Sequence, residues 1–183
     1  TNVEFMSGEE KHSQILVVSS FNPGSGKTFL TMNLAASLSI KGKRILVIDG
    51  DLRHGSASAY VGSPKTGLSD YLGERLEQLD EIIQPVPDYA NLFILPVGTI
   101  PPNPTELLEK ERFVTLMNSF RKEFDYILID CPPVELVADT QIMESQADRM
   151  LFVVRTGLLE RSMLNELEIF YKEKKLHKNM DFH

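Results

Sequence analysis

The sequence predicts an α/β fold in which a mostly parallel central sheet lies between two layers of helices, giving a three-layer sandwich. Short apolar runs alternate along the chain with amphipathic segments of helical length, a pattern typical of strand–helix–strand units. The runs Ile45–Ile48 and Ile127–Ile129 are continuously apolar rather than alternating with polar residues. Such runs indicate strands that are covered on both faces. Sheets of this kind bind ligands beyond the carboxyl ends of their strands.

Each expected element follows from its local pattern. The apolar runs predict strands over Gln14–Ser20, Arg44–Asp49, Asn91–Val97, Tyr126–Asp130 and Arg149–Arg155. The amphipathic stretches predict helices over Thr28–Lys41, Thr66–Glu74, Thr105–Glu123, Asp139–Gln146 and Glu160–Lys175. We expect Pro96–Pro104 to be an ordered connection, because Pro104 suits the first turn of a helix. The whole chain, 1–183, is expected to form a single domain.

Composition limits the classes of function. The 183 residues carry a formal net charge of −7, which argues against broad electrostatic attachment to nucleic acid or anionic lipid. The single cysteine, Cys131, excludes an internal disulfide framework and a cysteine-based metal site, and it fits a reducing compartment. No apolar run approaches the ~20 residues that span a bilayer.

A glycine-rich loop separates the first expected strand from the first expected helix. Residues Ser20–Thr28 read Ser-Phe-Asn-Pro-Gly-Ser-Gly-Lys-Thr. A tight turn at the start of a helix gathers backbone N–H groups, and the helix dipole favours an anion there. Lys27 would add a positive charge for the outer phosphates, and Thr28 a hydroxyl for Mg²⁺. Phe21 stands where the general phosphate-loop pattern has glycine, so the alternative is an ordinary glycine turn.

Carboxylates follow two further strands at their carboxyl ends. Asp130 ends an apolar run, where a buried charge is costly unless something compensates it; nucleotide-bound Mg²⁺ would do so. Asp49 and Asp51 are spaced to point to the same side of an extended chain, and a cation would relieve their repulsion. Arg53 would neutralise this pair or contact a phosphate. The alternatives are a carboxylate capping a turn at Asp130 and a solvated acidic turn paired with Arg53.

Together, these motifs resemble those of the bacterial tyrosine kinases of capsule and exopolysaccharide export. That family combines a Walker A loop with an apolar run ending in Asp-x-Asp-x-Arg and another ending in Asp-x-Pro-Pro. The matching segments here are Pro23–Thr28, Leu46–Arg53 and Leu128–Pro133. Pro101–Leu108 also resembles a segment common in the family. The resemblance covers nearly the whole chain and implies a P-loop NTPase-like fold.

The resemblance implies an ATP- and Mg²⁺-dependent, autophosphorylating protein-tyrosine kinase that regulates capsular or exopolysaccharide biosynthesis and export. It implies that Thr28, Asp51 and Asp130 hold the metal and that Asp49 is the base that accepts the tyrosine hydroxyl proton. The implied catalytic set is Asp49, Lys27, Asp51 and Arg53. The implied ATP- or ADP-binding residues are Pro23, Gly24, Ser25, Gly26, Lys27, Thr28 and Phe29.

The resemblance also implies partners and a location. The expected partners are further copies of the protein, in trans-autophosphorylation and a ring-like homo-oligomer, protein tyrosine substrates, and a transmembrane polysaccharide co-polymerase region in cis or in trans. Nucleic acid is not expected. The expected location is the inner face of the bacterial membrane, as a tethered cytoplasmic domain. We expect an excised fragment, because the family's C-terminal tyrosine cluster and N-terminal oligomerisation motif are lacking, and hence weaker self-association and autophosphorylation.

Two other functions stay open. One is a partitioning or cell-division ATPase of the deviant Walker A class, which places a signature lysine where this chain has Asn22. The other is a regulatory module that binds nucleotide and transfers nothing. Among single residues, Tyr126 and Cys131 are expected to be buried and His54 to lie at the surface. Tyr60 and Tyr71 are candidate secondary phosphorylation sites.

Overall fold

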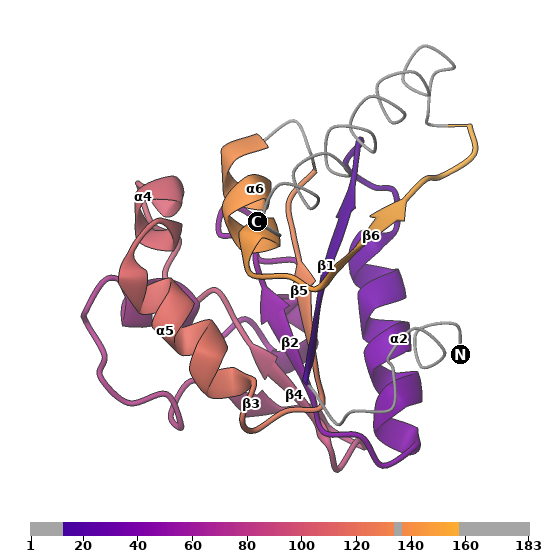
Figure 1. Ribbon diagram of the computed structural model, residues 1–183, viewed down its shortest axis with the longest axis horizontal. Helices are drawn as coiled ribbons and strands as arrows, with labels where there is room; N and C mark the ends of the chain where they lie inside the picture. Colours follow the sequence, from indigo (N-terminus) through magenta and orange to yellow (C-terminus); the bar gives the residue numbers. More distant parts are fainter. Residues whose placement is uncertain (1–12, 134–136, 158–183) are drawn as a thin grey trace, which may run out of the picture. The chain divides into compact units, whose positions relative to one another are not determined.

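The computed structural model describes residues 13–133 and 137–157, and its centre is a six-stranded sheet (Figure 1). The strands run in the order β3-β4-β2-β5-β1-β6. Their bounds are β1 Gln14–Ser20, β2 Ile45–Asp49, β3 Gln84–Pro85, β4 Leu92–Leu95, β5 Tyr126–Asp130 and β6 Arg149–Val153. All neighbouring strands are parallel except β3, which pairs antiparallel with β4. The predicted α/β class and mostly parallel sheet are therefore confirmed.

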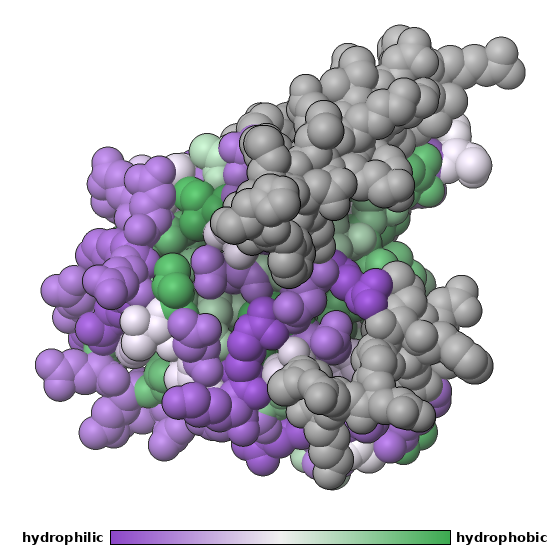
Figure 2. Space-filling view, viewed as in Figure 1, coloured by the Kyte–Doolittle hydropathy of each residue, from purple (hydrophilic) through white to green (hydrophobic). Residues whose placement is uncertain are grey.

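Helices cover both faces of the sheet (Figure 1). Their bounds are α2 Lys27–Ile40, α3 Leu68–Leu72, α4 Pro104–Leu108, α5 Glu111–Phe120 and α6 Val137–Ser145, with a short 3-10 helix, η1, at Ser58–Val61. Helix α2 packs on one face, and α4, α5 and α6 lie on the other. Over α4 and α5 the outer surface is mostly hydrophilic (Figure 2). None of the described helices is long and apolar enough to cross a membrane.

The three-layer arrangement follows from the alternation of side chains along each strand. In β2, Leu46 and Ile48 join the apolar cluster that contains the α5 side chains, whereas Ile45 and Val47 join the cluster that contains the α2 side chains. In β5, Ile127 and Leu128 divide in the same way. Because both faces are covered, both sets of side chains must be apolar, which explains the continuous runs in the sequence.

The structure differs from the expected elements at several points. The expected helix Thr105–Glu123 is two helices, because Lys110 adopts an extended backbone between α4 and α5. The Lys110 ammonium donates to the carbonyl of Leu72, the last residue of α3. Strand β3 and η1 were not expected, since elements this short carry no periodic signal. The expected helix Glu160–Lys175 lies outside the described residues.

Contacts divide the chain into two compact units, 1–153 and 154–183. The first contains the whole sheet and every described helix. Of the second, the structure describes only 154–157. That the chain forms a single domain stays a prediction.

Truncating the buried face of α5 should destabilise the sheet. Phe120 is 1% exposed and packs edge-to-face on Phe124 at 5.9 Å between ring centroids. We expect Phe120→Ala to lower the free energy of unfolding by about 3–5 kcal/mol. Val114 lies on the same helix but is 38% exposed, so Val114→Ala should change it by less than about 0.5 kcal/mol. Urea unfolding followed by circular dichroism measures both, and equal losses would contradict this packing.

Candidate active site

The motifs singled out in the sequence meet at one edge of the sheet. Asp49 ends β2 and Asp130 ends β5, and the two lie directly opposite each other in the parallel register. Strand β1, which leads into the glycine-rich loop, pairs with the other side of β5, where Val18 lies opposite Asp130. Because parallel strands end at the same edge, the loop and the two carboxylates lie next to one another.

The glycine-rich loop has a backbone that requires glycine at two positions. Gly24 and Gly26 have φ angles of 73° and 90°, in the left-handed region where a side chain is strained. A Cβ atom at either residue would meet nothing within 4 Å, so the requirement is conformational and the space above the loop is open. Helix α2 begins at Lys27, directly after Gly26, and no side chain caps it. Its first-turn amides are therefore available to a ligand.

The residue that departs from the general loop pattern has a packing partner. The ring of Phe21 lies edge-to-face against Phe152 of β6, with 4.9 Å between centroids. The loop is also held by Asn22, whose carbonyl accepts from the hydroxyls of Ser20, at 2.8 Å, and Ser25, at 2.6 Å. Phe21 thus anchors the loop to the sheet.

Asp130 is buried, and only one of its two carboxylate oxygens has a hydrogen-bond partner. Its side chain accepts a hydrogen bond on Oδ2 from the Thr28 hydroxyl at 2.5 Å, while Oδ1 has no hydrogen-bond partner. Burial raises the pKa of Asp130, and the Thr28 hydrogen bond and the Lys27 charge partly oppose that rise. A buried carboxylate with one open oxygen, bonded to the first turn of α2, is suited to a cation.

Asp49 is fully buried and held from one side. Its Oδ2 accepts from the backbone N–H of Ser58 at 2.6 Å and from the Ser58 hydroxyl at 2.7 Å, whereas Oδ1 has no hydrogen-bond partner. Burial raises the pKa of Asp49 to about 6, against the Ser58 hydrogen bonds, and the charges of Asp130 and Asp51 raise it further. The carboxylate is thus fixed in place and more basic than an ordinary aspartate.

The Asp51 carboxylate has hydrogen-bond partners in the residues that directly follow it in the chain. Its Oδ1 accepts from the backbone N–H groups of Arg53, at 3.3 Å, and His54, at 3.2 Å. The His54 Nδ1 lies 3.1 Å from both carboxylate oxygens. The His54 side chain is 69% exposed, as expected for a surface residue. Asp51 is 7% exposed, so it is the most accessible of the three acids.

Arg53 was expected either to neutralise Asp49 and Asp51 or to contact a phosphate, and the structure does not show the first role. Its guanidinium does not pair with Asp49 or Asp51; it forms an ion pair with Asp139 of α6 at 2.9 Å. Asp139 also accepts from the Thr105 hydroxyl at 2.5 Å. The other expected role, contact with a phosphate, stays a prediction.

Sequence reasoning missed Ser58, Asp139 and Gly50. Ser58 and Asp139 carry no motif, and Asp139 lies 86 positions from the arginine it binds. Gly50 donates its N–H to the Asp130 carbonyl at 2.9 Å. A Cβ there would lie 2.7 Å from the Met143 sulfur and 3.0 Å from an Ile129 methyl carbon. The glycine inside the Asp-x-Asp pair therefore lets β2 and β5 end side by side beneath α6.

The donor set fits Mg²⁺ that arrives with a nucleotide. In the described part of the chain, no group of three or more His, Cys, Asp or Glu side chains is arranged to hold a metal on its own. Mg²⁺ is commonly bound by one or two carboxylates together with phosphate oxygens and water. Thr28, Asp130 and Asp51 supply hard oxygen donors of that kind.

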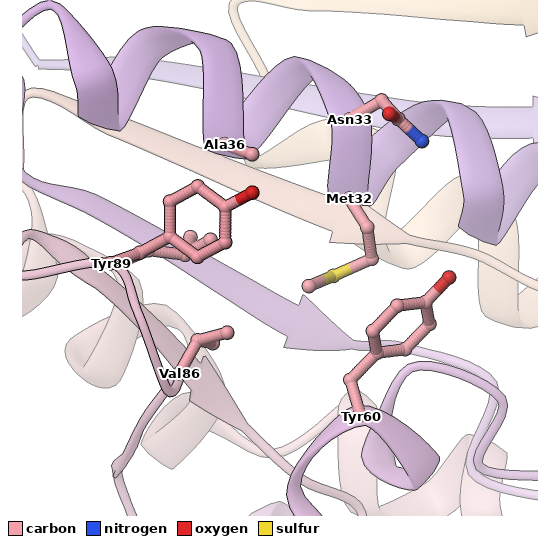
Figure 3. Close-up of a pocket in the computed structure, with 7 residues that line it drawn as sticks. Met32, Asn33, Ala36, Tyr60, Val86 and Tyr89 are labelled. Atoms are coloured by element: carbon pink, nitrogen blue, oxygen red, sulfur yellow. The ribbon is translucent and has the colours of Figure 1, made fainter.

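A pocket of about 130 Å³ lies elsewhere, against α2 (Figure 3). The side chains of Tyr60 and Tyr89 lie on either side of Met32 (Figure 3). Its lining contains none of the glycine-loop residues or the acids; it consists of Met32, Asn33, Ala36, Tyr60, Val86, Tyr89 and Leu92. This pocket is therefore not part of the candidate active site.

The expected burial of Tyr126 and Cys131 is confirmed. Tyr126 is 5% exposed and Cys131 is 1% exposed, and burial raises the pKa of the Cys131 thiol. Tyr60 is exposed, whereas Tyr71 is partly buried and its ring lies 4.1 Å from the Arg112 guanidinium carbon. Phosphorylation of either tyrosine stays a prediction.

Comparisons with known proteins agree with this geometry. The model of the AAA domain family matches residues 13–182. The tyrosine-protein kinase CpsD of Streptococcus pneumoniae is 35% identical over 159 residues, which are 86% of this chain and 68% of CpsD. The kinase domain of the Escherichia coli tyrosine kinase ETK superposes with a TM-score of 0.84 at 30% identity, over 94% of this chain and 66% of that domain. The chain belongs to the AAA domain family and, within it, to the bacterial tyrosine kinases.

Two further comparisons set the limits of that assignment. EpsB of Ralstonia solanacearum is 38% identical over 177 residues, which are 94% of this chain and 22% of EpsB. The chain therefore spans about a fifth of the length of that relative. The septum site-determining protein MinD of Pyrococcus horikoshii, complexed with Mg-ADP, has a TM-score of 0.69 at 24% identity, over 88% of this chain and 66% of MinD. That likeness shows the shared P-loop NTPase-like fold alone.

Burial of the Asp49 carboxylate should lower the free energy of unfolding at neutral pH. Its pKa is about 6 in the folded protein and 3.8 for the ordinary group, so the folded state binds the extra proton and loses stability as pH rises through this window. In EDTA, we expect Asp49→Asn to stabilise the protein by about 1 kcal/mol at pH 7.5, an advantage that disappears near pH 4. Thermal unfolding against pH measures it.

A matched control is Asp70→Asn. Asp70 is also buried, but its Oδ2 accepts from two backbone N–H groups, those of Gly67 and Thr99. Asp70→Asn weakens these two charge-assisted hydrogen bonds, so it should destabilise the protein by about 1–3 kcal/mol at pH 7.5. If both substitutions destabilise it equally, the proposed destabilising effect of the buried Asp49 charge is wrong.

Proposed function

We propose that this protein is a Mg²⁺- and ATP-dependent protein-tyrosine kinase acting in capsule or exopolysaccharide biosynthesis and export. The observation that carries the proposal is the pairing of Asp49 and Asp130. The two buried acids lie side by side, and each has an oxygen without a hydrogen-bond partner. Only Asp130 is bonded to the first turn of α2. This asymmetry suits two roles, one carboxylate at a metal and the other at a proton.

The phosphate end of the site would be formed by the glycine-rich loop. The amides of Pro23–Phe29, proline excepted, together with the Lys27 ammonium, would surround the phosphates of ATP or ADP. Thr28, Asp130 and Asp51 would hold Mg²⁺, which supplies neutralisation of phosphate charge when it is bound. Phosphoryl transfer requires mainly positioning and charge stabilisation, and these groups would supply both.

Asp49 would accept the proton of the tyrosine hydroxyl. A phenol has a pKa of about 10 and is a poor nucleophile at neutral pH without a base. Asp49 has a raised pKa of about 6, so at pH 7 it is mostly ionised and yet more basic than an exposed aspartate. Ser58 holds Oδ2 of its carboxylate, and the buried Oδ1, which has no hydrogen-bond partner, is the oxygen that would take the proton.

We extend the proposal to the whole protein. By its family, it would autophosphorylate in trans within a ring-like homo-oligomer and act with a transmembrane polysaccharide co-polymerase region in cis or in trans. The kinase domain would then be tethered at the inner face of the bacterial membrane. The name of CpsD and the superposition on ETK support a tyrosine kinase.

A MinD-like ATPase is the second candidate, because the fold is shared with MinD. Asn22 stands at the position of that class's signature lysine, which favours the kinase. A nucleotide-binding regulatory module is the third candidate.

Phosphoryl transfer should depend on Lys27 and on Asp49 in different ways. With labelled ATP, we expect phosphotyrosine in the wild-type protein and none in Lys27→Met, because the phosphates lose their charge partner. Asp49→Asn should keep ADP affinity within about threefold while lowering the transfer rate by about 10²–10⁴-fold, the usual contribution of a general base. Phosphoamino acid analysis and calorimetric titration with Mg-ADP measure these effects.

The same experiment separates the candidates. ATP hydrolysis stimulated by DNA or a membrane partner, with no phosphotyrosine, would replace the kinase with the MinD-like ATPase. Nucleotide binding with neither activity would indicate a regulatory module. Glu144→Gln, on α6 and outside the proposed set, is the control and should leave transfer unchanged.

A further inference from the structure

Asp139 is a buried carboxylate that no motif of the sequence includes. It lies in the first turn of α6 and is 2% exposed. Both of its oxygens accept short hydrogen bonds, Oδ1 from the Thr105 hydroxyl at 2.5 Å and Oδ2 from the Arg53 guanidinium at 2.9 Å. A single side chain thus joins α6, the first turn of α4 and the loop that follows β2.

The electrostatics of this contact are one-sided. The Asp139 side chain is 3% exposed, while that of Arg53 is 36% exposed. A buried carboxylate without a cation is strongly unfavourable, so Asp139 holds Arg53 firmly. Arg53 is partly exposed and could be solvated by water without Asp139. Asp139 is buried and depends on Arg53, so the ion pair fixes the position of the arginine.

Arg53 is also bound to the candidate site through its backbone. Its N–H donates to Asp51 Oδ1 at 3.3 Å, so the same residue touches a proposed metal ligand through its backbone and Asp139 through its side chain. A guanidinium has five N–H donors in a rigid plane. The ion pair uses one of its terminal nitrogens, which leaves further donors on the exposed part.

We propose that Asp139 is a positioning residue: together with Thr105 it fixes the Arg53 guanidinium so that its remaining donors meet the phosphoryl oxygens of the bound nucleotide. The inference rests on the proposed function and on the predicted contact of Arg53 with a phosphate. Thr105 orients Asp139 through Oδ1 and so contributes indirectly. We call Asp139 and Thr105 the Arg53 anchor.

A fixed guanidinium matters more to the transition state than to binding. Charge that develops on a transferring phosphoryl group is stabilised best by donors already in place. A mobile Arg53 would still attract ATP, but it would have to be ordered in each reaction cycle. Losing the anchor should therefore lower kcat much more than it changes KM for ATP.

The test is a double-mutant cycle on phosphotyrosine formation in the full-length protein. We expect Arg53→Ala to lower kcat by about 100-fold and Asp139→Asn by about 10-fold, each with less than about a threefold change in KM for ATP. The double variant should match Arg53→Ala, because Asp139 acts only through Arg53. Thr105→Val should lower kcat severalfold, and Thr105→Ser should retain the wild-type value.

A second ion pair supplies the structural control. Arg121 and Asp148 form a pair at 2.8 Å next to the first residues of β1, at the opposite edge of the sheet. Asp148→Asn should lower the melting temperature and leave kcat within twofold. Additive losses in the double variant, or an unchanged kcat in Arg53→Ala, would overturn the anchor while leaving the kinase proposal intact.

A readout that needs no phosphoryl transfer separates the two proposals. The side-chain NMR signals of Arg53 should shift when a nonhydrolysable ATP analogue and Mg²⁺ are added, and the shift should be lost in Asp139→Asn. If the wild-type protein shows this shift but forms no phosphotyrosine, the kinase proposal is refuted and the Arg53 anchor proposal is supported. No shift in the wild-type protein would refute the anchor whether or not the kinase is active.

Discussion

Two carboxylates buried side by side, those of Asp49 and Asp130, constrain the rest of this edge of the sheet. The register places them on neighbouring parallel strands, and the charge of Asp130 helps to raise the pKa of Asp49. Such a pair is tolerated only where local donors and an incoming cation offset its cost. The surrounding structure supplies the donors separately: Thr28 bonds to Asp130 and Ser58 to Asp49.

The local backbone allows these two acids to approach. Gly50 has no side chain because Met143 and Ile129 occupy that space, and the Gly50 N–H bonds to the carbonyl of Asp130. Ser58 has a second role, since its hydroxyl accepts from the Val97 N–H at 2.9 Å. The support of Asp49 is therefore linked to the start of the connection after β4. The basicity of Asp49 is thus a property of the packed edge, set by residues from separate parts of the chain.

The sequence predicted the features that local patterns determine, and it missed those that depend on contacts between residues far apart in the chain. Strands β1 and β5 have the expected bounds, because burial on both faces requires uninterrupted apolar runs. The loop and the acids were placed at one edge by topology alone. Lys110 was expected inside a helix, but its contact with α3 depends on tertiary packing. Asp139 and Ser58 likewise bind partners that no local pattern specifies.

The shared fold does not separate a kinase from a MinD-like ATPase, so the distinction rests on particular residues, among them Asn22 in the loop and the acids at the strand ends. A water molecule is small and mobile and can be oriented by a single polar group, whereas a tyrosine is delivered by another polypeptide and needs a base that is already fixed. Asp49 is held on one oxygen by two hydrogen bonds and has no partner on the other. Burying a carboxylate with an unpartnered oxygen costs stability, and groups with perturbed pKa values of this kind cluster at functional sites. In the proposed function, this fixed carboxylate would serve as the base for a positioned hydroxyl.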